Sequence, residues 1–206
     1  MSRFMTPPSE EALRKAVTVV EADSSAEVVV VVKARSASYR HVDLSLGMAI
    51  AVACLAFMLY TPWPFAWHFL LLTPVAAAIG VAVLSSKIPM LARALSKAQT
   101  MQASVQQAAR AAFVEAGVHH TQFRSGVLIY VSLLERRVEL VADSGVELAI
   151  AKEEWNDFAA KMQSAVQEGG GAGALATVIE SSAEVFAKHL PPQDEDVNEL
   201  PDGVID

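Results

Sequence analysis

The chain lacks charge over one long stretch. Among its 206 residues, no Asp, Glu, Lys or Arg occurs from Leu44 to Ser86. A charged side chain at the centre of a bilayer costs roughly 2.5–3.5 kcal/mol on insertion scales, so membrane spans exclude such residues. The uncharged stretch is about twice as long as the roughly 20 residues that cross one bilayer core. The sequence therefore predicts a hairpin of two membrane-spanning helices.

Other absences exclude several kinds of catalytic and binding site. The single cysteine, Cys54, lies inside the uncharged stretch, so no disulfide can form within the chain and a packing role is favoured over a nucleophile. No glycine-rich loop ending in Lys-Ser or Lys-Thr follows a strand, and no serine lies in a G-x-S-x-G turn. The net charge of −7 argues against a nucleic-acid partner.

Prolines divide the uncharged stretch into two spans. The predicted helices are Leu44 to Tyr60 and Phe65 to Leu84, joined by a short link that contains Pro62 and Pro64. Tyr60, Trp63 and Trp67 cluster at this link, as aromatic residues do at a membrane interface, although ordinary packing is the alternative. Neither span carries an ionisable residue at mid-depth, so the hairpin is interpreted as an anchor and not a pore.

Basic residues flank the hairpin on both sides. By the positive-inside bias, both termini are predicted to be cytoplasmic, in an inner or plasma membrane. No early apolar segment indicates a cleavable signal peptide. The residues that carry this prediction are Lys33, Arg35 and Arg40 before the first span, and Lys87, Arg93 and Lys97 after the second.

The soluble part begins with a helix predicted over Ser9 to Val20, followed by a strand from Glu27 to Lys33. Five consecutive valines make this strand typical of one buried on both faces. A segment this short buries too little surface to fold alone. The strand must therefore join a sheet formed elsewhere in the chain.

The remainder of the chain supplies that sheet. Nearly all-apolar residues from Gly126 to Leu133 and an alternating segment from Arg137 to Ala142 predict a β-hairpin, with the second strand half exposed. Helices are predicted over Ala92 to Ala116, Glu153 to Glu168 and Ala174 to His189, with apolar stripes that indicate core positions.

These elements predict an α/β fold with a small mixed sheet of three or four strands, interrupted by the membrane hairpin. The expected divisions are a first helix and strand (1–43), the transmembrane hairpin (44–86), the rest of the same domain (87–190) and an acidic flexible tail (191–206). The tail carries six acids and no Lys or Arg after Leu190, and is interpreted as solubilising or as a docking peptide that uses Val197, Leu200 and Val204.

The run RSGVLIYVSLLERRVELVADSGVE, from Arg124 to Glu147, resembles the core hairpin of the TPM domain family. Trp155 with its helix, the glycine-rich break, the last helix and the ending Asn198 to Asp202 are similar to the membrane-bound bacterial branch of that family. The resemblance implies an α/β/α sandwich. Family members include plant thylakoid proteins linked to photosystem repair, with reported acid phosphatase activity, and an animal accessory protein of acetylcholine receptors.

Some members of the family look like divalent-cation binders. The segment before the first helix often contains an Asp in the family, whereas here it is Thr6-Pro7-Pro8-Ser9. This chain therefore lacks, at that position, a carboxylate that could take part in metal or phosphatase chemistry.

Carboxylates at the end of the second hairpin strand form the candidate metal site. Asp143 and Glu147, with Asp23 as a further contributor, could hold Ca²⁺ or Mg²⁺, although Asp-Ser-Gly is also ordinary turn chemistry. The adjacent His119 and His120 favour a solvated loop over a metal site. Arg136 and Arg137 are predicted at an exposed hairpin tip, or near anionic headgroups.

No catalytic residue is identified, because no convincing nucleophile, base or phosphate cradle accompanies the strong anchor. The expected function is an interaction or modulating module for membrane protein complexes, in assembly or quality control, with a membrane-protein partner. The alternative, which the family resemblance implies, is a divalent-metal-assisted phosphatase with Asp143 as the best candidate ligand.

Overall fold

The computed structural model describes residue 4, residues 6–193 and residues 204–205. The chain divides into two compact units, one formed by residues 1–36 and 102–206 and the other by residues 37–101. The elements, in chain order, are α1 (Pro7–Asp23), β1 (Glu27–Lys33), α2 (Arg40–Tyr60), α3 (Trp67–Ser86), α4 (Pro89–Leu95), α5 (Ala98–Glu115), the 3₁₀ helix η1 (Val118–His120), β2 (Gly126–Ser132), β3 (Arg137–Ala142), α6 (Ser144–Ala149), α7 (Lys152–Gln167), α8 (Gly171–Ser181), α9 (Ala183–His189) and β4 (Val204–Ile205).

The sheet of the first unit has the strand order β3-β2-β1-β4. β1 and β2 are parallel, with Val28 opposite Val127, and β2 and β3 form the antiparallel hairpin. This confirms that the valine strand joins a sheet formed elsewhere in the chain, although the uncharged stretch separates β1 from β2 in sequence. The two-residue β4 pairs in parallel with Val30 and Val31 of β1.

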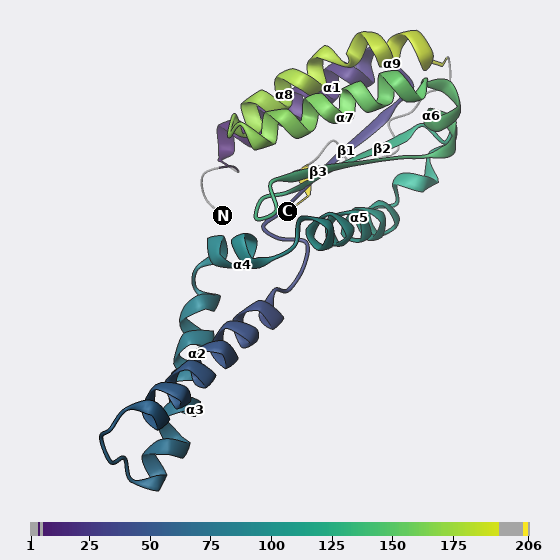
Figure 1. Cartoon of the computed structure of the whole chain (residues 1–206). Helices are drawn as coiled ribbons and strands as arrows, with labels where there is room; N and C mark the ends of the chain where they lie inside the picture. Colours follow the sequence, from purple (N-terminus) through teal and green to yellow (C-terminus); the bar gives the residue numbers. More distant parts are fainter. Residues whose placement is uncertain (1–3, 5, 194–203, 206) are drawn as a thin grey trace. The chain divides into compact units, whose positions relative to one another are not determined.

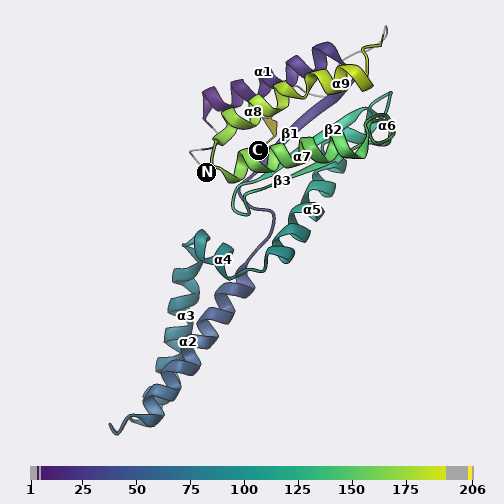
Figure 2. The same cartoon turned by 45° about the horizontal axis from the view of Figure 1, so that its top comes forward.

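Helices cover both faces of this sheet, as an α/β/α sandwich requires. In Figures 1 and 2, α1, α7, α8 and α9 lie on one face and α5 lies on the other. Val28, Val30 and Val32 face the first layer, whereas Val29 and Val31 pack with residues of α5. All five valines are at most 3 % exposed. Each buried valine contributes roughly 1.5–3 kcal/mol of transfer free energy, so this strand is the centre of two cores.

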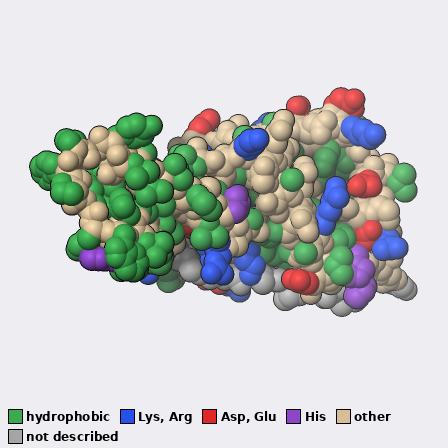
Figure 3. All heavy atoms as spheres, turned by 60° about the horizontal axis from the view of Figure 1, so that its bottom comes forward, with side chains coloured by type: hydrophobic (Ala, Val, Ile, Leu, Met, Phe, Trp, Pro, Cys, Tyr) green, Lys and Arg blue, Asp and Glu red, His purple; other side chains and the backbone are tan. Residues whose placement is uncertain are grey.

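The second unit is dominated by the α2–α3 hairpin, in which α2 covers the first predicted span and α3 covers the second except for Phe65 and Ala66. Both are long and apolar enough to cross a membrane, with mean hydropathy of 2.2 and 2.1 over windows that are only 17 % and 11 % buried. Hydrophobic side chains gather over this hairpin in Figure 3. The helices approach closely at Gly47, where an added Cβ would lie 2.6 Å from the carbonyl oxygen of Ala78. Small residues at a helix contact are typical of membrane helix pairs.

The prediction of one continuous helix over Ala92 to Ala116 is wrong. This segment consists of α4 and α5, which are separated at Ser96, where the backbone is extended (φ −86°, ψ 141°). α4 does not continue α3 either. Pro89 begins α4, and a proline disfavours helical backbone at the residue before it, which here is Ile88 (φ −114°, ψ 85°).

Other helix boundaries also differ from the prediction, and two of them have a clear local cause. The last helix begins at Gly171 and is interrupted at Ser182, whose hydroxyl donates to the carbonyl of Ile179 at 2.6 Å. The first helix begins at Pro7 and not at Ser9, because proline suits the first turn of a helix, where its missing N–H is not needed. The acidic tail prediction falls mostly outside the described residues; of its apolar positions, only Val204 is placed, in β4.

Candidate functional site

Asp143, the main predicted metal ligand, caps a short helix. The sequence predicts a turn here, whereas the structure continues from Asp143 into α6. Its Oδ1 accepts a hydrogen bond from the backbone N–H of Ser144 at 2.6 Å, and its Oδ2 forms an ion pair with Nη1 of Arg124 at 3.4 Å. The carboxylate is 8 % exposed, and its Oδ1 also accepts a hydrogen bond from the Ser144 hydroxyl at 3.2 Å, so Ser144 and Arg124 define its surroundings.

The other two predicted ligands lie differently. Glu147 is exposed on α6, and its backbone N–H donates to the carbonyl of Asp143 at 3.1 Å, so these two residues share a turn. Asp23 is exposed at the end of α1. Within the part of the chain that the structure describes, no three His, Cys, Asp or Glu side chains are grouped so that they could hold a metal. Arg124 pairs with Asp143 at this position, and the Ca²⁺ or Mg²⁺ site stays a prediction.

The two adjacent histidines form η1 instead of an irregular loop. Their rings lie 3.8 Å apart between centroids, and the ring of His119 also contacts Phe113 at 6.2 Å. Arg124 donates from Nη1 to the carbonyl of His119 at 3.2 Å. Arg124 therefore joins η1 to the Asp143 cap, which makes this corner a structural junction between β2 and β3.

A buried polar cluster that the sequence did not predict lies where β1 and β2 end. The Ser36 hydroxyl donates to Oγ of Ser132 at 2.6 Å and also contacts Oη of Tyr130 at 3.3 Å. Ser132 donates to Oε2 of Glu135 at 2.5 Å, and the N–H of Ser36 donates to Oε1 of Glu135 at 3.1 Å. Glu135, only 3 % exposed, therefore binds both the end of β2 and the segment that leaves β1.

The surroundings of this cluster shift the pKa of its tyrosine. Burial raises the pKa of the Tyr130 hydroxyl above its usual value of 10.0; the hydrogen bond from Ser36 opposes this rise, and the charge of Glu135 adds to it. Tyr130 is therefore neutral at physiological pH. Ser36 is the last residue of the first unit before the chain continues to α2, so the cluster holds the point where the chain leaves the domain.

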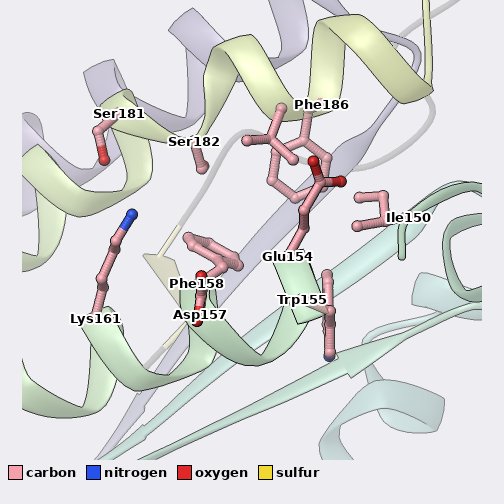
Figure 4. Close-up of a pocket in the computed structure, with 10 residues that line it drawn as sticks. Ile150, Glu154, Trp155, Asp157, Phe158, Lys161, Ser181, Ser182 and Phe186 are labelled. Carbon is pink, nitrogen blue, oxygen red and sulfur yellow. The ribbon is translucent and has the colours of Figure 1, made fainter. Parts of the chain in front are cut away.

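A cavity of about 120 Å³ opens between α7 and the α8–α9 layer. Trp155, Phe158 and Phe186 give it an aromatic lining, and in Figure 4 the charged side chains of Glu154 and Lys161 extend along its rim. Phe158 and Phe186 pack edge to face, with ring centroids 5.9 Å apart. An aromatic floor with a charged rim suits an apolar side chain that arrives on a polar partner surface.

Contacts of Glu154 with two residues at the end of α9 fix one side of this cavity. Oε1 of Glu154 lies 3.2 Å from Nζ of Lys188, and Oε2 lies 2.7 Å from Nε2 of His189. The hydrogen bond from Lys188 is the largest cause of a lowered pKa for Glu154, so this carboxylate remains ionised at neutral pH.

The sequence missed these sites for definite reasons. Trp155 and Phe158 are predicted as core, and Phe158 is indeed buried, whereas Trp155 is half-buried and lines the cavity. Helical spacing identifies an apolar stripe but not whether the opposite layer fills the space above it. Glu135 lies in a polar hairpin turn, and its burial depends on Ser36, which is far away in sequence. The one available signal was a carboxylate between two apolar strands.

Comparison with known proteins agrees with this fold. The profile of the TPM domain matches residues 93–185. The NMR structure of the BA42 protein from the psychrophilic bacterium Bizionia argentinensis sp. nov. is similar, with a TM-score of 0.59 at 17 % identity over 100 % of this chain and 97 % of that one. At this identity the likeness concerns the fold alone. No curated protein matches the chain in sequence.

The matched segment does not include β1. The valine strand nevertheless lies at the centre of the sheet, between β2 and β4, so the part of the chain before the hairpin completes the same domain. Residues 93–185 therefore match the TPM domain, as the resemblance of the β2–β3 hairpin implied.

Proposed function

We propose that this chain is a membrane-anchored TPM domain that acts as an interaction or modulating module for membrane protein complexes, in their assembly or quality control. The observation that carries the proposal is the position of the α2–α3 hairpin between β1 and β2, two strands that pair directly. An anchor at this position ties the domain to the bilayer through two chain segments instead of one. Such a domain meets its partners in the plane of the membrane.

The membrane location is supported by the exposure and composition of the hairpin. A core helix of a soluble protein would be mostly buried, whereas α2 and α3 are exposed along most of their length. The basic residues flanking both ends favour cytoplasmic termini in an inner or plasma membrane. Reporter fusions at the C-terminus should be active only for a cytoplasmic reporter, and an active exported reporter would reverse this orientation.

The cavity between α7 and α9 is the proposed contact with a membrane-protein partner. Its volume of about 120 Å³ matches one inserted side chain and not a substrate-sized ligand, since small-molecule pockets occupy roughly 300–1,000 Å³. Interface anchors are typically single apolar or aromatic side chains in such pockets, surrounded by a polar rim.

Site-specific crosslinking in intact membranes tests this contact. A photoreactive residue at Lys161, on the cavity rim, should crosslink one defined membrane protein, whereas the same residue at the exposed Lys15 of α1 should not. Replacing Trp155 with alanine should reduce the Lys161 adduct because it removes part of the lining. Identical adducts from both positions, or no adduct from correctly inserted protein, would count against the proposal.

The alternative function is a divalent-metal-assisted phosphatase. The observation that favours it is the shared turn of Asp143 and Glu147 beside the cationic Arg124. Phosphatase turnover by the detergent-purified chain, lost in Asp143→Ala but retained in Glu10→Ala on an exposed position of α1, would support this activity. Inertness of the purified chain together with a specific crosslinked partner would support the interaction module.

A further inference from the structure

Four basic residues of the second unit gather at one end of its helical hairpin. Arg40 is the first residue of α2, and Lys87 follows the last residue of α3. The two ends are joined by a hydrogen bond from the hydroxyl of Ser85 to Oδ1 of Asp43 at 2.6 Å. Arg93 lies in α4, which packs against both α2 and α3, and Lys97 follows α4.

Positive charge predominates in this unit of the chain. Between residues 37 and 101 the sequence contains four basic residues and a single acid, Asp43. That acid is engaged by Ser85 within the helix contact. The local excess of positive charge therefore attracts an anionic ligand or surface.

An apolar groove begins beside these charges. It runs between α2 and α3 with a volume of about 660 Å³. Arg40, Asp43 and Ser86 line its polar end, and its apolar walls include Leu44, Met48, Val75, Ile79 and Val83. A groove that is cationic at one end and apolar along its length is complementary to an amphiphile with an anionic head.

The short helix α4 supplies a second, independent indication of a lipid surface. Ile88, just before it, is 46 % exposed, and Met90 and Leu95 are 78 % and 52 % exposed. Arg93 lies among these apolar residues. Large apolar side chains interspersed with basic ones are typical of helices that lie in the interface between headgroups and acyl chains.

We propose that the cytoplasmic end of the α2–α3 hairpin is a binding site for an anionic phospholipid. Arg40 and Lys87 contact the headgroup phosphate, an acyl chain occupies the α2–α3 groove, and α4 lies in the interface with Arg93 and Lys97 directed to neighbouring headgroups. This inference rests on the proposed membrane anchoring. Basic pockets between membrane helices on the cytoplasmic side bind anionic headgroups by the same electrostatics.

Lipid binding to the detergent-purified full chain tests the site. Retention of phosphatidylglycerol and of phosphatidylcholine with the same acyl chains is compared by native mass spectrometry. Phosphatidylglycerol should bind at least tenfold more tightly, and the preference should weaken in high salt. Glycerol phosphate, which has no acyl chains, should neither bind nor compete at equal concentration, which distinguishes a lipid from a free phosphate.

Matched variants separate the headgroup contact from general charge. The double substitution Arg40→Gln with Lys87→Gln should reduce phosphatidylglycerol affinity about 25-fold, at roughly fivefold per lost surface charge, and reduce phosphatidylcholine affinity much less, because its choline already offsets the phosphate charge. Lys15→Gln with Lys152→Gln, on exposed positions of α1 and α7, is the control and should have no effect.

Three outcomes would overturn the lipid site: equal affinity for the two lipids, an unchanged affinity in the Arg40 and Lys87 variant, or crosslinks from Ile79 to a protein helix that added lipid does not displace. Alkaline extraction of membranes separates this failure from failure of the anchor. If the chain stays in the membrane pellet, the anchoring proposal stands while the lipid site falls; release into the supernatant contradicts both.

Discussion

Glu135 offers the sharpest test of how the domain holds the chain segment that leads to the hairpin. Its two carboxylate oxygens accept hydrogen bonds from the N–H of Ser36 and the hydroxyl of Ser132. Glu135→Ala removes both acceptors and leaves two donors without these partners. An orphaned buried donor costs about 1–3 kcal/mol. Because Ser36 is only partly buried, the expected loss is about 2–4 kcal/mol in total.

Hydrogen exchange measured by mass spectrometry reports this loss locally. The neighbouring bonds from Leu133 N–H to the Lys33 carbonyl and from Leu134 N–H to the Ala34 carbonyl, both 3.0 Å, belong to the same junction. A loss of about 2 kcal/mol should accelerate exchange of these amides roughly 30-fold. Peptides from α7, which takes no part in the cluster, should change much less.

Two further variants separate the loss of the Glu135 hydrogen bonds from the loss of a carboxylate in general. Glu135→Gln keeps one acceptor oxygen and removes the charge, so it should cost less than Glu135→Ala, by about 1 kcal/mol. Glu139→Ala, on the half-buried strand β3, is the matched control for loss of a carboxylate. The reasoning is refuted if exchange at the junction changes less than about twofold in Glu135→Ala, or equally in Glu139→Ala.

Three further predictions concern other parts of the fold. Gly126→Ala should destabilise the domain by about 1–3 kcal/mol in denaturant titrations, because an added Cβ would lie 2.1 Å from the carbonyl oxygen of Val118; normal stability would show that η1 moves freely. Gly47→Leu should lower the melting temperature of the hairpin in detergent, whereas Gly80→Leu should not, since nothing lies within 4 Å of a Cβ there; equal effects would contradict the helix contact. Burial raises the pKa of Glu139 above its usual 4.5, so the stability associated with its protonated form is present below pH 4.5 and lost as the pH rises through the folded-state pKa. Glu139→Gln should therefore be more stable than the wild type above this range and equal to it below, which thermal melts across pH would check.

Much of the architecture was predictable because it depends on which residues avoid water. An uncharged stretch of this length has few stable environments outside a bilayer, and the structure places two exposed apolar helices over it. Likewise, five consecutive valines require burial on both faces, and β1 has that burial between α1 and α5.

Helix continuity was less predictable, because it depends on single residues. Composition favoured one helix through Ser96, and only the backbone of Ile88 and Ser96 shows where the chain turns. Asp143 is a similar case. Its sequence context allows a metal ligand or a turn, and it does not reveal the ion pair with Arg124, whose guanidinium reaches the carboxylate from the segment that enters β2.

The sequence by itself determined the uncharged hairpin, the doubly buried valine strand and the β2–β3 hairpin, because hydrophobic burial follows from the order of side chains along the chain. Only the tertiary structure decided the Glu135 cluster, the aromatic cavity beside Glu154 and the cationic end of the α2–α3 groove. Each of these joins residues that are far apart in sequence, and the strength of a hydrogen bond or ion pair depends on distances and burial that the folded chain alone sets.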